Sequence, residues 1–214
     1  MTSGSKIFAL LLGLSLPWLA NASAAEGDAA AQSLIASLGR PAPARTAFAE
    51  VRFMKILEQP RVSSGELSWL GGDRLERRVE QPAKEVATIA DGEVTQQREG
   101  RKPRSFSLNR APQLQVLLDS FVALLGGDAS RLNQAFAIHH DGNAERWTLI
   151  LTPRDTRVAK VIASIQIDGR GNEPRCMRMQ EADGDLAIDL LGELAARMPA
   201  APTREALAAL CQGG

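Results

Sequence analysis

The run of residues 113–126 constrains the fold most, because it is strongly helical and interrupts a chain otherwise built of short alternating segments. At about 100° per residue, most of its apolar side chains fall within an arc of roughly 160°, as in an amphipathic helix. They are Leu114, Leu117, Leu118, Phe121, Val122, Leu124 and Leu125. Pro112 precedes the run and two glycines end it, which favours a helix start and a helix end.

The segments on either side of this helix predict β-strands, some six before it and about five after it. Apolar and polar residues alternate along them, as in 46–57 and 160–167. Turn sequences such as Asp91-Gly92 recur about every ten residues, which favours an antiparallel up-and-down sheet. Eleven twisted strands tend to curl into a barrel or half-barrel. The helix then either packs on the sheet or covers an opening.

The amino terminus has the pattern of a secretory signal peptide. Lys6 supplies the positive charge, residues 7–16 an apolar core, and residues 22–24 an Ala-Ser-Ala cleavage site. We therefore expect a signal peptide over 1–24, cleaved near Ala24, and one exported domain over 25–214, which in a bacterium means the periplasm. We expect its first helix over 27–38.

Charge and motifs exclude several classes of function. Without the signal peptide the chain has 24 basic and 25 acidic residues, a net charge of −1, since that peptide holds one of the 25 basic residues and no acid. Such balance favours neither nucleic acid nor an anionic membrane as partner.

The adjacent His139 and His140 point to opposite faces of a strand and cannot chelate one metal together. Asp183 and Asp185 flank a turn glycine, where aspartate is usual. With no nucleophile elbow or phosphate loop, we expect no enzyme, no cofactor and no metal site.

The two cysteines, Cys176 and Cys211, are more often bridged than free in an oxidising compartment. By strand alternation Cys176 lies opposite Met177 and Met179. If the methionines point inward, the bridge holds the carboxy-terminal helix, over about 203–211, to the outer wall.

A series of short motifs resembles the LolA family of outer-membrane lipoprotein carriers. The motifs are an early strand from Phe48 to Phe53, Ser-Gly-Glu-Leu-Ser-Trp at 64–69, a basic strand at 73–77, Gln81-Pro82, and Ile-Ala-Asp-Gly at 89–92. The resemblance continues more loosely through 147–153 and 165–169. It implies an α+β fold: an incomplete antiparallel β-barrel of about eleven strands, with a hydrophobic cavity covered by lid helices.

The resemblance also implies a function. Members of the family shield the acyl chains of lipoproteins across the periplasm, taking them from an inner-membrane ABC transporter to an outer-membrane receptor. We expect a monomer that acts as such a lipoprotein carrier in outer membrane biogenesis. Alternatives are a carrier for a glycolipid, a fatty acid or a polyene-type lipid, a lipid-sensing regulatory module, or an adaptor domain without ligand.

One departure from the family pattern concerns the lid. The family has a basic residue and a proline after the Ser-Gly-x-Leu strand, and the arginine helps to hold the lid closed. Here Gly71-Gly72 stands at that position. Either Arg74 or Arg77 substitutes for the arginine, or lid control differs.

The candidate site has two parts, for which plain core packing is the alternative interpretation. The expected lid residues are Leu114, Leu117, Leu118, Phe121 and Leu125. The expected cavity residues are Val51, Phe53, Leu67, Trp69, Leu149, Leu151, Ile165, Ile167, Leu186 and Ile188.

Overall fold

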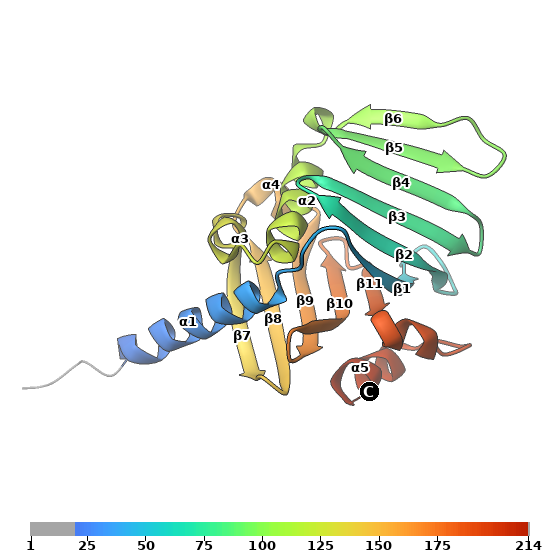
Figure 1. The fold of residues 1–214 in the computed structure, drawn as a ribbon. Helices are drawn as coiled ribbons and strands as arrows, with labels where there is room; N and C mark the ends of the chain where they lie inside the picture. Colours follow the sequence, from blue (N-terminus) through green and yellow to red (C-terminus); the bar gives the residue numbers. More distant parts are fainter. Residues whose placement is uncertain (1–19, 214) are drawn as a thin grey trace, which may run out of the picture.

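The computed structural model describes residues 20–213, and one antiparallel sheet of eleven strands dominates it (Figure 1). Most of the predicted signal peptide lies outside the described residues. The strands before the central helix are β1 Ala44–Phe53, β2 Arg61–Gly71, β3 Arg74–Gln81, β4 Glu85–Ala90, β5 Glu93–Arg98 and β6 Arg104–Ser107. Those after it are β7 Phe136–Asn143, β8 Arg146–Pro153, β9 Ile162–Arg170, β10 Glu173–Glu181 and β11 Leu186–Leu191. The predicted α+β class and strand number are confirmed.

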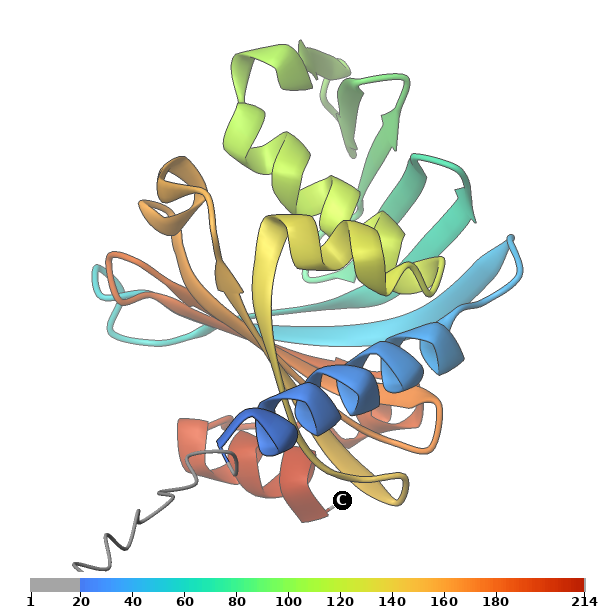
Figure 2. The same ribbon diagram turned by 90° about the vertical axis from the view of Figure 1, so that its left-hand side faces the viewer.

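The strand order explains where the central helix lies. The sheet runs β6-β5-β4-β3-β2-β1-β11-β10-β9-β8-β7, so the first strand pairs with the last and the two middle strands form the edges. The chain between these edges forms η1 Leu108–Arg110, α2 Pro112–Leu125 and α3 Ala129–Ala135. The sheet is therefore open at β6 and β7, and the helical segment is the connection between those two edges (Figures 1 and 2).

The helices begin and end at residues with clear local reasons. Pro112 occupies the first turn of α2, where its missing N–H costs nothing, and the chain turns at Gly126 and Gly127 after the helix. Asp128 caps α3, its Oδ1 accepting from the Arg131 amide at 2.9 Å. The others are α1 Ala20–Leu38, α4 Thr156–Ala159, η2 Gly192–Arg197 and α5 Arg204–Gly213. The first helix starts earlier than the predicted Gly27. Over residues 20–213, no helix has both the length and the hydropathy that crossing a bilayer requires.

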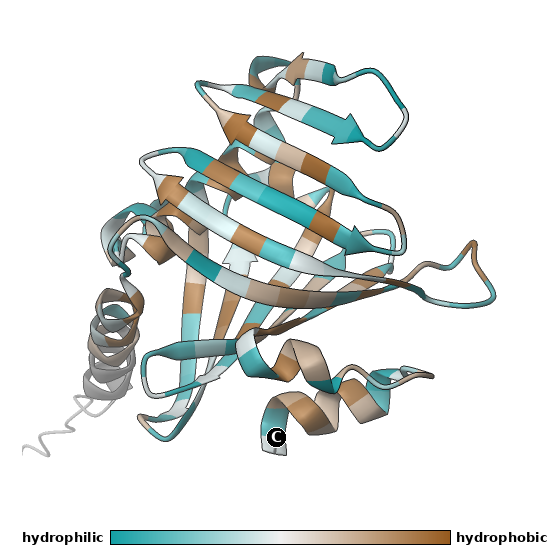
Figure 3. Ribbon diagram, turned by 45° about the vertical axis from the view of Figure 1, so that its right-hand side comes forward, coloured by the Kyte–Doolittle hydropathy of each residue, from teal (hydrophilic) through white to brown (hydrophobic). Residues whose placement is uncertain are grey.

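Hydrophilic and hydrophobic residues alternate along several strands (Figure 3), and successive side chains of a strand point to opposite faces of the sheet. Helices pack on both faces. The inner face carries Glu50 on β1, Ile167 on β9 and Met177 on β10, and α1, α2 and α3 pack on it. Its main core cluster contains Ile35, Leu38, Leu117, Ala123, Leu124, Leu132, Phe136, Trp147, Leu149, Leu151, Ile162, Ile165 and Ile167. The outer face carries Val51 and Ile188, and η2 and α5 pack on it.

A disulfide joins α5 to the outer face. Cys176 on β10 and Cys211 on α5 are bonded, with their Cα atoms 5.6 Å apart. Both lie in the outer core cluster with Val51, Ile188, Leu190, Leu194 and Leu207. Met177 and Met179, on alternate positions of the same strand, pack instead against the inner cluster.

Candidate functional site

The inner face is filled over β8 and β9. Leu149, Leu151, Ile165 and Ile167, four of the expected cavity residues, belong to the inner core cluster, and none is more than 2% exposed. They pack in one cluster with buried residues of α1, α2 and α3. In this structure they are core residues.

Four other expected cavity residues lie on the opposite side of the sheet, which corrects the prediction that all ten share one wall. Val51 and Ile188 are members of the outer cluster, and Phe53 and Leu186 pack against it. The error has a physical cause. Alternation separates two faces without telling which one is inner, and on β1 the more apolar set is the one that α5 and η2 cover.

The remaining two, Leu67 and Trp69, lie on the inner face of β2 and are only half-buried. Trp69 is paired with Leu75 on β3, which is paired with Ile89 on β4. Ala87 lies two residues before Ile89 on the same face, and all of these side chains are half-buried. We call Leu67, Trp69, Leu75, Ala87 and Ile89 the apolar row.

Sequence reasoning missed three members of this row, Leu75, Ala87 and Ile89. The signal that identifies them is cross-strand pairing with Trp69 and with one another, which depends on register and not on local alternation.

The expected lid residues of α2 divide into two groups. Leu117 belongs to the inner core cluster, and Leu114 and Phe121 pack against it. Leu118 and Leu125 are half-buried and belong to neither core cluster. One flank of α2 is therefore built into the core, while the flank with Leu118 and Leu125 is not.

Contacts with α1, with the residues that follow it and with α3 hold α2 in place. The Arg40 amide donates to the Leu125 carbonyl at 2.9 Å, and Arg131 of α3 pairs with Asp119 at 3.2 Å. Gly127 passes so close to α1 that a Cβ there would lie 2.9 Å from the Ala36 carbonyl oxygen, with φ at +70°.

Neither of the arginines that were expected to hold the lid bonds to α2. Arg74 is exposed, and among the side chains of residues 29–213 no hydrogen bond or ion pair connects it or Arg77 to α2. Arg77 instead crosses the inner face of β2. Its Nη2 lies 3.4 Å from Glu50 Oε1 and 3.2 Å from Ser63 Oγ, and its guanidinium lies 4.5 Å from the centre of the Phe48 ring.

Charged residues border the apolar row on β1 and β11. Asp189 pairs across the ladder with Glu50 and is 5% exposed. Burial, then the Glu50 charge, raise the pKa of Asp189 to about 8 against the opposing effect of Arg77 and Arg52. The inner face thus carries the apolar row on β2 to β4, with Arg77 between Leu67 and Ala87, and charged residues where β1 meets β11.

Two cavities are lined by residues outside the apolar row. One of ≈ 800 Å³ lies at the β7–β8 turn and is lined by Asp141, Arg146 and Gln212, among others. The other, of ≈ 220 Å³, is lined by Arg78, Glu85 and their neighbours on β3 to β5. Neither is lined by an expected cavity or lid residue.

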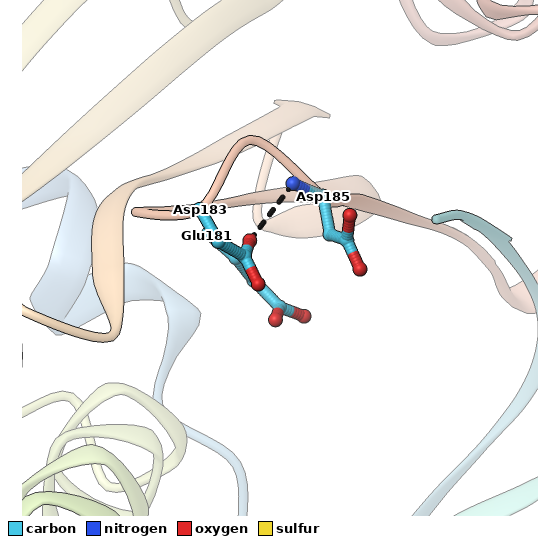
Figure 4. A group of neighbouring side chains, drawn as sticks. All are labelled: Glu181, Asp183 and Asp185. Atoms are coloured by element: carbon cyan, nitrogen blue, oxygen red, sulfur yellow. Dashed lines mark hydrogen bonds between the residues drawn. The ribbon is translucent and has the colours of Figure 1, made fainter. Parts of the chain in front are cut away.

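Three carboxylates meet at the β10–β11 turn (Figure 4). Glu181 pairs with Arg52, Asp183 Oδ1 accepts from the Asp185 amide at 3.0 Å, and Asp185 Oδ1 accepts from the Lys55 amide at 2.9 Å. The ion pair and the two hydrogen bonds explain why the three carboxylates lie close together at this turn.

Comparisons with known proteins place the chain in a family. A family model described as outer membrane lipoprotein carrier protein LolA-like matches residues 21–214. No curated protein matches.

Several solved structures are similar to this one. The LolA superfamily protein NE2245 from Nitrosomonas europaea has 12% identity and a TM-score of 0.42, with 77% of this chain and 92% of that chain covered. A putative outer membrane lipoprotein-sorting protein domain from Vibrio parahaemolyticus has 10% identity and a TM-score of 0.42, with 79% and 92% covered. The Pseudomonas aeruginosa MucA/MucB complex has 14% identity and a TM-score of 0.39, with 87% of this chain and 62% of that chain covered.

Because the family match spans residues 21–214, this protein belongs to the LolA-like family of outer membrane lipoprotein carriers, which are carriers and not enzymes.

Proposed function

We propose that this protein carries a lipid whose acyl chains lie between the apolar row of β2 to β4 and helix α2, the acyl chains of a lipoprotein being the first candidate. The observation that carries the proposal is the contrast within the inner face. Over β8 and β9 the apolar side chains are sealed in the core, whereas Leu67, Trp69, Leu75, Ala87 and Ile89 remain half-buried.

The physical reason for a carrier is the cost of exposing acyl chains to water. Each methylene group withdrawn from water contributes about 0.8 kcal/mol, so chains of a dozen or more carbons need a protein surface to cross an aqueous compartment. Half-buried apolar side chains on one face of a curled sheet supply such a surface.

The two flanks of α2 support uptake and release. Leu117 anchors one flank in the core, and the Arg40–Leu125 backbone bond fixes the carboxy-terminal end. Leu118 and Leu125 are outside both clusters, so their flank is free to exchange contacts with a ligand. A carrier must also release its cargo, and a helix anchored on one side only suits that task.

Family and disulfide indicate an extracytoplasmic protein. Within that compartment we place it, as part of the proposal, in the periplasm after removal of a signal peptide over 1–24. On the same basis its partners are an inner-membrane ABC transporter as donor and an outer-membrane receptor as acceptor.

Two substitutions on one strand test the proposal. Leu67 lies on the inner face of β2, and Val62, 39% exposed, lies on its outer face. Leu67→Asp should abolish binding of a fluorescent fatty acid to delipidated protein, since it places a charge against the chain. Val62→Asp is the matched control and should keep binding within twofold. Equal binding by wild type and Leu67→Asp would contradict the proposed site.

A third substitution tests the helix. Leu118→Asp should abolish fatty-acid binding while the circular dichroism spectrum of the sheet and the cooperative melt are retained. If Leu118→Asp unfolds the protein, α2 is core on both flanks and does not act as a lid.

The cargo is identified by extracting the natively exported protein with organic solvent. Lipid near one equivalent per chain supports carriage, and its chemistry distinguishes a lipoprotein from a glycolipid or a fatty acid. An empty extract, together with no binding of fluorescent fatty acid, would contradict carriage and favour an adaptor role.

A further inference from the structure

The apolar row continues across the sheet to the open edge at β6. Ile89 of the row is paired with Val94 on β5, and Val94 is paired with Phe106 on β6. Directly paired residues place their side chains on one face, so both lie on the inner face with the row. Because neighbouring strands are about 4.8 Å apart, the ladder from Trp69 on β2 to Phe106 is about 19 Å long. A fatty chain that follows this ladder reaches the edge of the sheet.

The last residue of the ladder is exposed. Val94 is 8% exposed, whereas Phe106 is 42% exposed. Strand β6 is the outermost strand of its half of the sheet (Figure 1), so no further strand lies beside Phe106. Exposed apolar surface that continues a half-buried row is typical of a ligand-binding surface. At this edge the polar end of a bound lipid would lie in water.

Arg104 lies on the same face as Phe106. Arg104 on β6 is paired with Gln96 on β5, and Gln96 is paired with Ala87 of the apolar row. Arg104 precedes Phe106 by two residues, which places the two side chains on one face and about 7 Å apart along the strand. Arg104 is exposed, and among the side chains of residues 29–213 its guanidinium group has no hydrogen bond or ion pair.

The turn that leads into β6 adds two more cations without partners. Arg101 and Lys102 are exposed, and no described side chain forms an ion pair with either of them. They lie three and two residues before Arg104 in the same hairpin. We call Arg101, Lys102 and Arg104 the basic edge.

The acidic residues nearby do not neutralise the basic edge. Glu85 is the one acidic residue on the inner face of β4 to β6, and it is already bound by Arg98 and Gln96. The turn itself contains one acid, Glu99, which is exposed. Three cations beside one acid leave an excess of two positive charges at the end of the apolar ladder. An anionic group is the ligand chemistry that matches this excess.

We propose that the basic edge binds the anionic polar end of a lipid, a carboxylate or a phosphate, whose chain lies along the ladder from Trp69 to Phe106. This rests on the proposed function, and it adds the charge of the ligand's polar end. Arginine suits the task, because its guanidinium group offers parallel N–H donors that match the oxygens of a carboxylate or a phosphate.

Three chains of equal length that differ only in the polar end provide the test. Binding of dodecanoate, dodecanol and dodecylamine is measured with the purified exported protein below the micellar concentration of each compound. At about pH 7 the acid is ionised and the amine is protonated. Wild type should bind dodecanoate at least about fivefold more tightly than dodecanol, as expected for exposed ion pairs, and dodecylamine most weakly.

One substitution in the basic edge and one outside it assign the effect. Arg104→Gln should reduce the preference for dodecanoate over dodecanol by at least about threefold and leave dodecanol binding unchanged, because it removes one exposed ion pair. Arg74→Gln is the matched control and should leave the preference unchanged. Arg74 is also exposed, but it precedes the inward-facing Leu75 and therefore lies on the outer face of β3.

Ionic strength and Phe106 test the two halves of the site separately. Raising the ionic strength from about 0.01 M to about 1 M shortens the screening length from about 30 Å to about 3 Å, so the wild-type preference for dodecanoate should fall. Phe106→Ser should weaken all three compounds by a similar factor, because it removes a contact with the chain. Dodecanol binding that is unchanged in Phe106→Ser would show that the chain does not reach β6.

The outcomes separate this inference from the proposed function. Equal binding of the three compounds by wild type overturns the anion site and leaves acyl-chain binding intact. Failure of all three to bind overturns both proposals. A preference that survives Arg104→Gln, is lost in Arg74→Gln, or stays constant with ionic strength overturns the assignment to the basic edge. Inorganic phosphate that binds alone as tightly as dodecanoate would make a free oxyanion the ligand and overturn the lipid.

Discussion

Removing the Cys176–Cys211 disulfide should destabilise the fold without affecting ligand binding. The bond closes a loop with a sequence separation of 35 residues, which contains β11 and η2. The chain-entropy relation for a loop of that length gives about 4 kcal/mol at 25 °C. A domain of this size has a total stability of about 5–15 kcal/mol, so the loss is a large fraction of it.

The location of the bond makes the second half of the prediction specific. Cys176 and Cys211 are packed with Ile188, Leu190 and Leu207 on the outer face, whereas α2 and the apolar row lie on the inner face. The double variant Cys176→Ala/Cys211→Ala should therefore bind a fluorescent fatty acid with unchanged affinity at temperatures where it is folded.

Urea denaturation followed by circular dichroism measures the effect. With a slope of about 2 kcal/mol per molar urea, a loss of about 4 kcal/mol lowers the midpoint by about 2 M. Reduced wild type is the control, because it keeps both sulfur atoms and loses only the cross-link. The reasoning is refuted if reduced wild type and oxidised wild type unfold at the same urea concentration, or if the double variant folds but no longer binds.

Three further predictions concern Asp189 and two glycines. The pKa of Asp189 is raised from 3.8 to about 8. Its contribution to the free energy of unfolding is therefore fully present below pH 4 and is lost as the pH rises to 8. The loss is up to about 1.4 kcal/mol per pH unit. Asp189→Asn should flatten that part of the stability profile in urea titrations from pH 4 to pH 9, and an unchanged slope would contradict the buried carboxyl group. Gly169→Ala should lower stability by about 1–3 kcal/mol in thermal melts, because its Cβ would lie 2.2 Å from the Trp147 ring, and a melt like that of wild type would contradict this packing. Gly127→Ala should speed hydrogen exchange of the α2 amides, because its Cβ would approach the Ala36 carbonyl oxygen to 2.9 Å, and exchange as slow as in wild type would show that α1 does not hold α2 there.

Local patterns in the sequence predicted much of the fold. Alternation and turn residues identified eleven strands, and periodicity with Pro112 and Gly126 identified α2. These signals are local because the backbone geometry of a strand, turn or helix depends on neighbouring residues. The same alternation put Cys176 on the opposite face from Met177 and Met179. In the structure Cys176 lies in the outer cluster, and both methionines pack against the inner cluster.

The sequence by itself thus determined the elements of this protein and the division of each strand into two sets of side chains. Only the tertiary structure decided which set faces inward, because helices cover both faces of the central strands and both sets contain apolar residues. Pairing between β1 and β11 brings Glu50 beside Asp189 from opposite ends of the chain, and pairing across β2, β3 and β4 assembles the apolar row. These contacts depend on strand order and register, which are set by the packing of the whole sheet and not by any local stretch of residues.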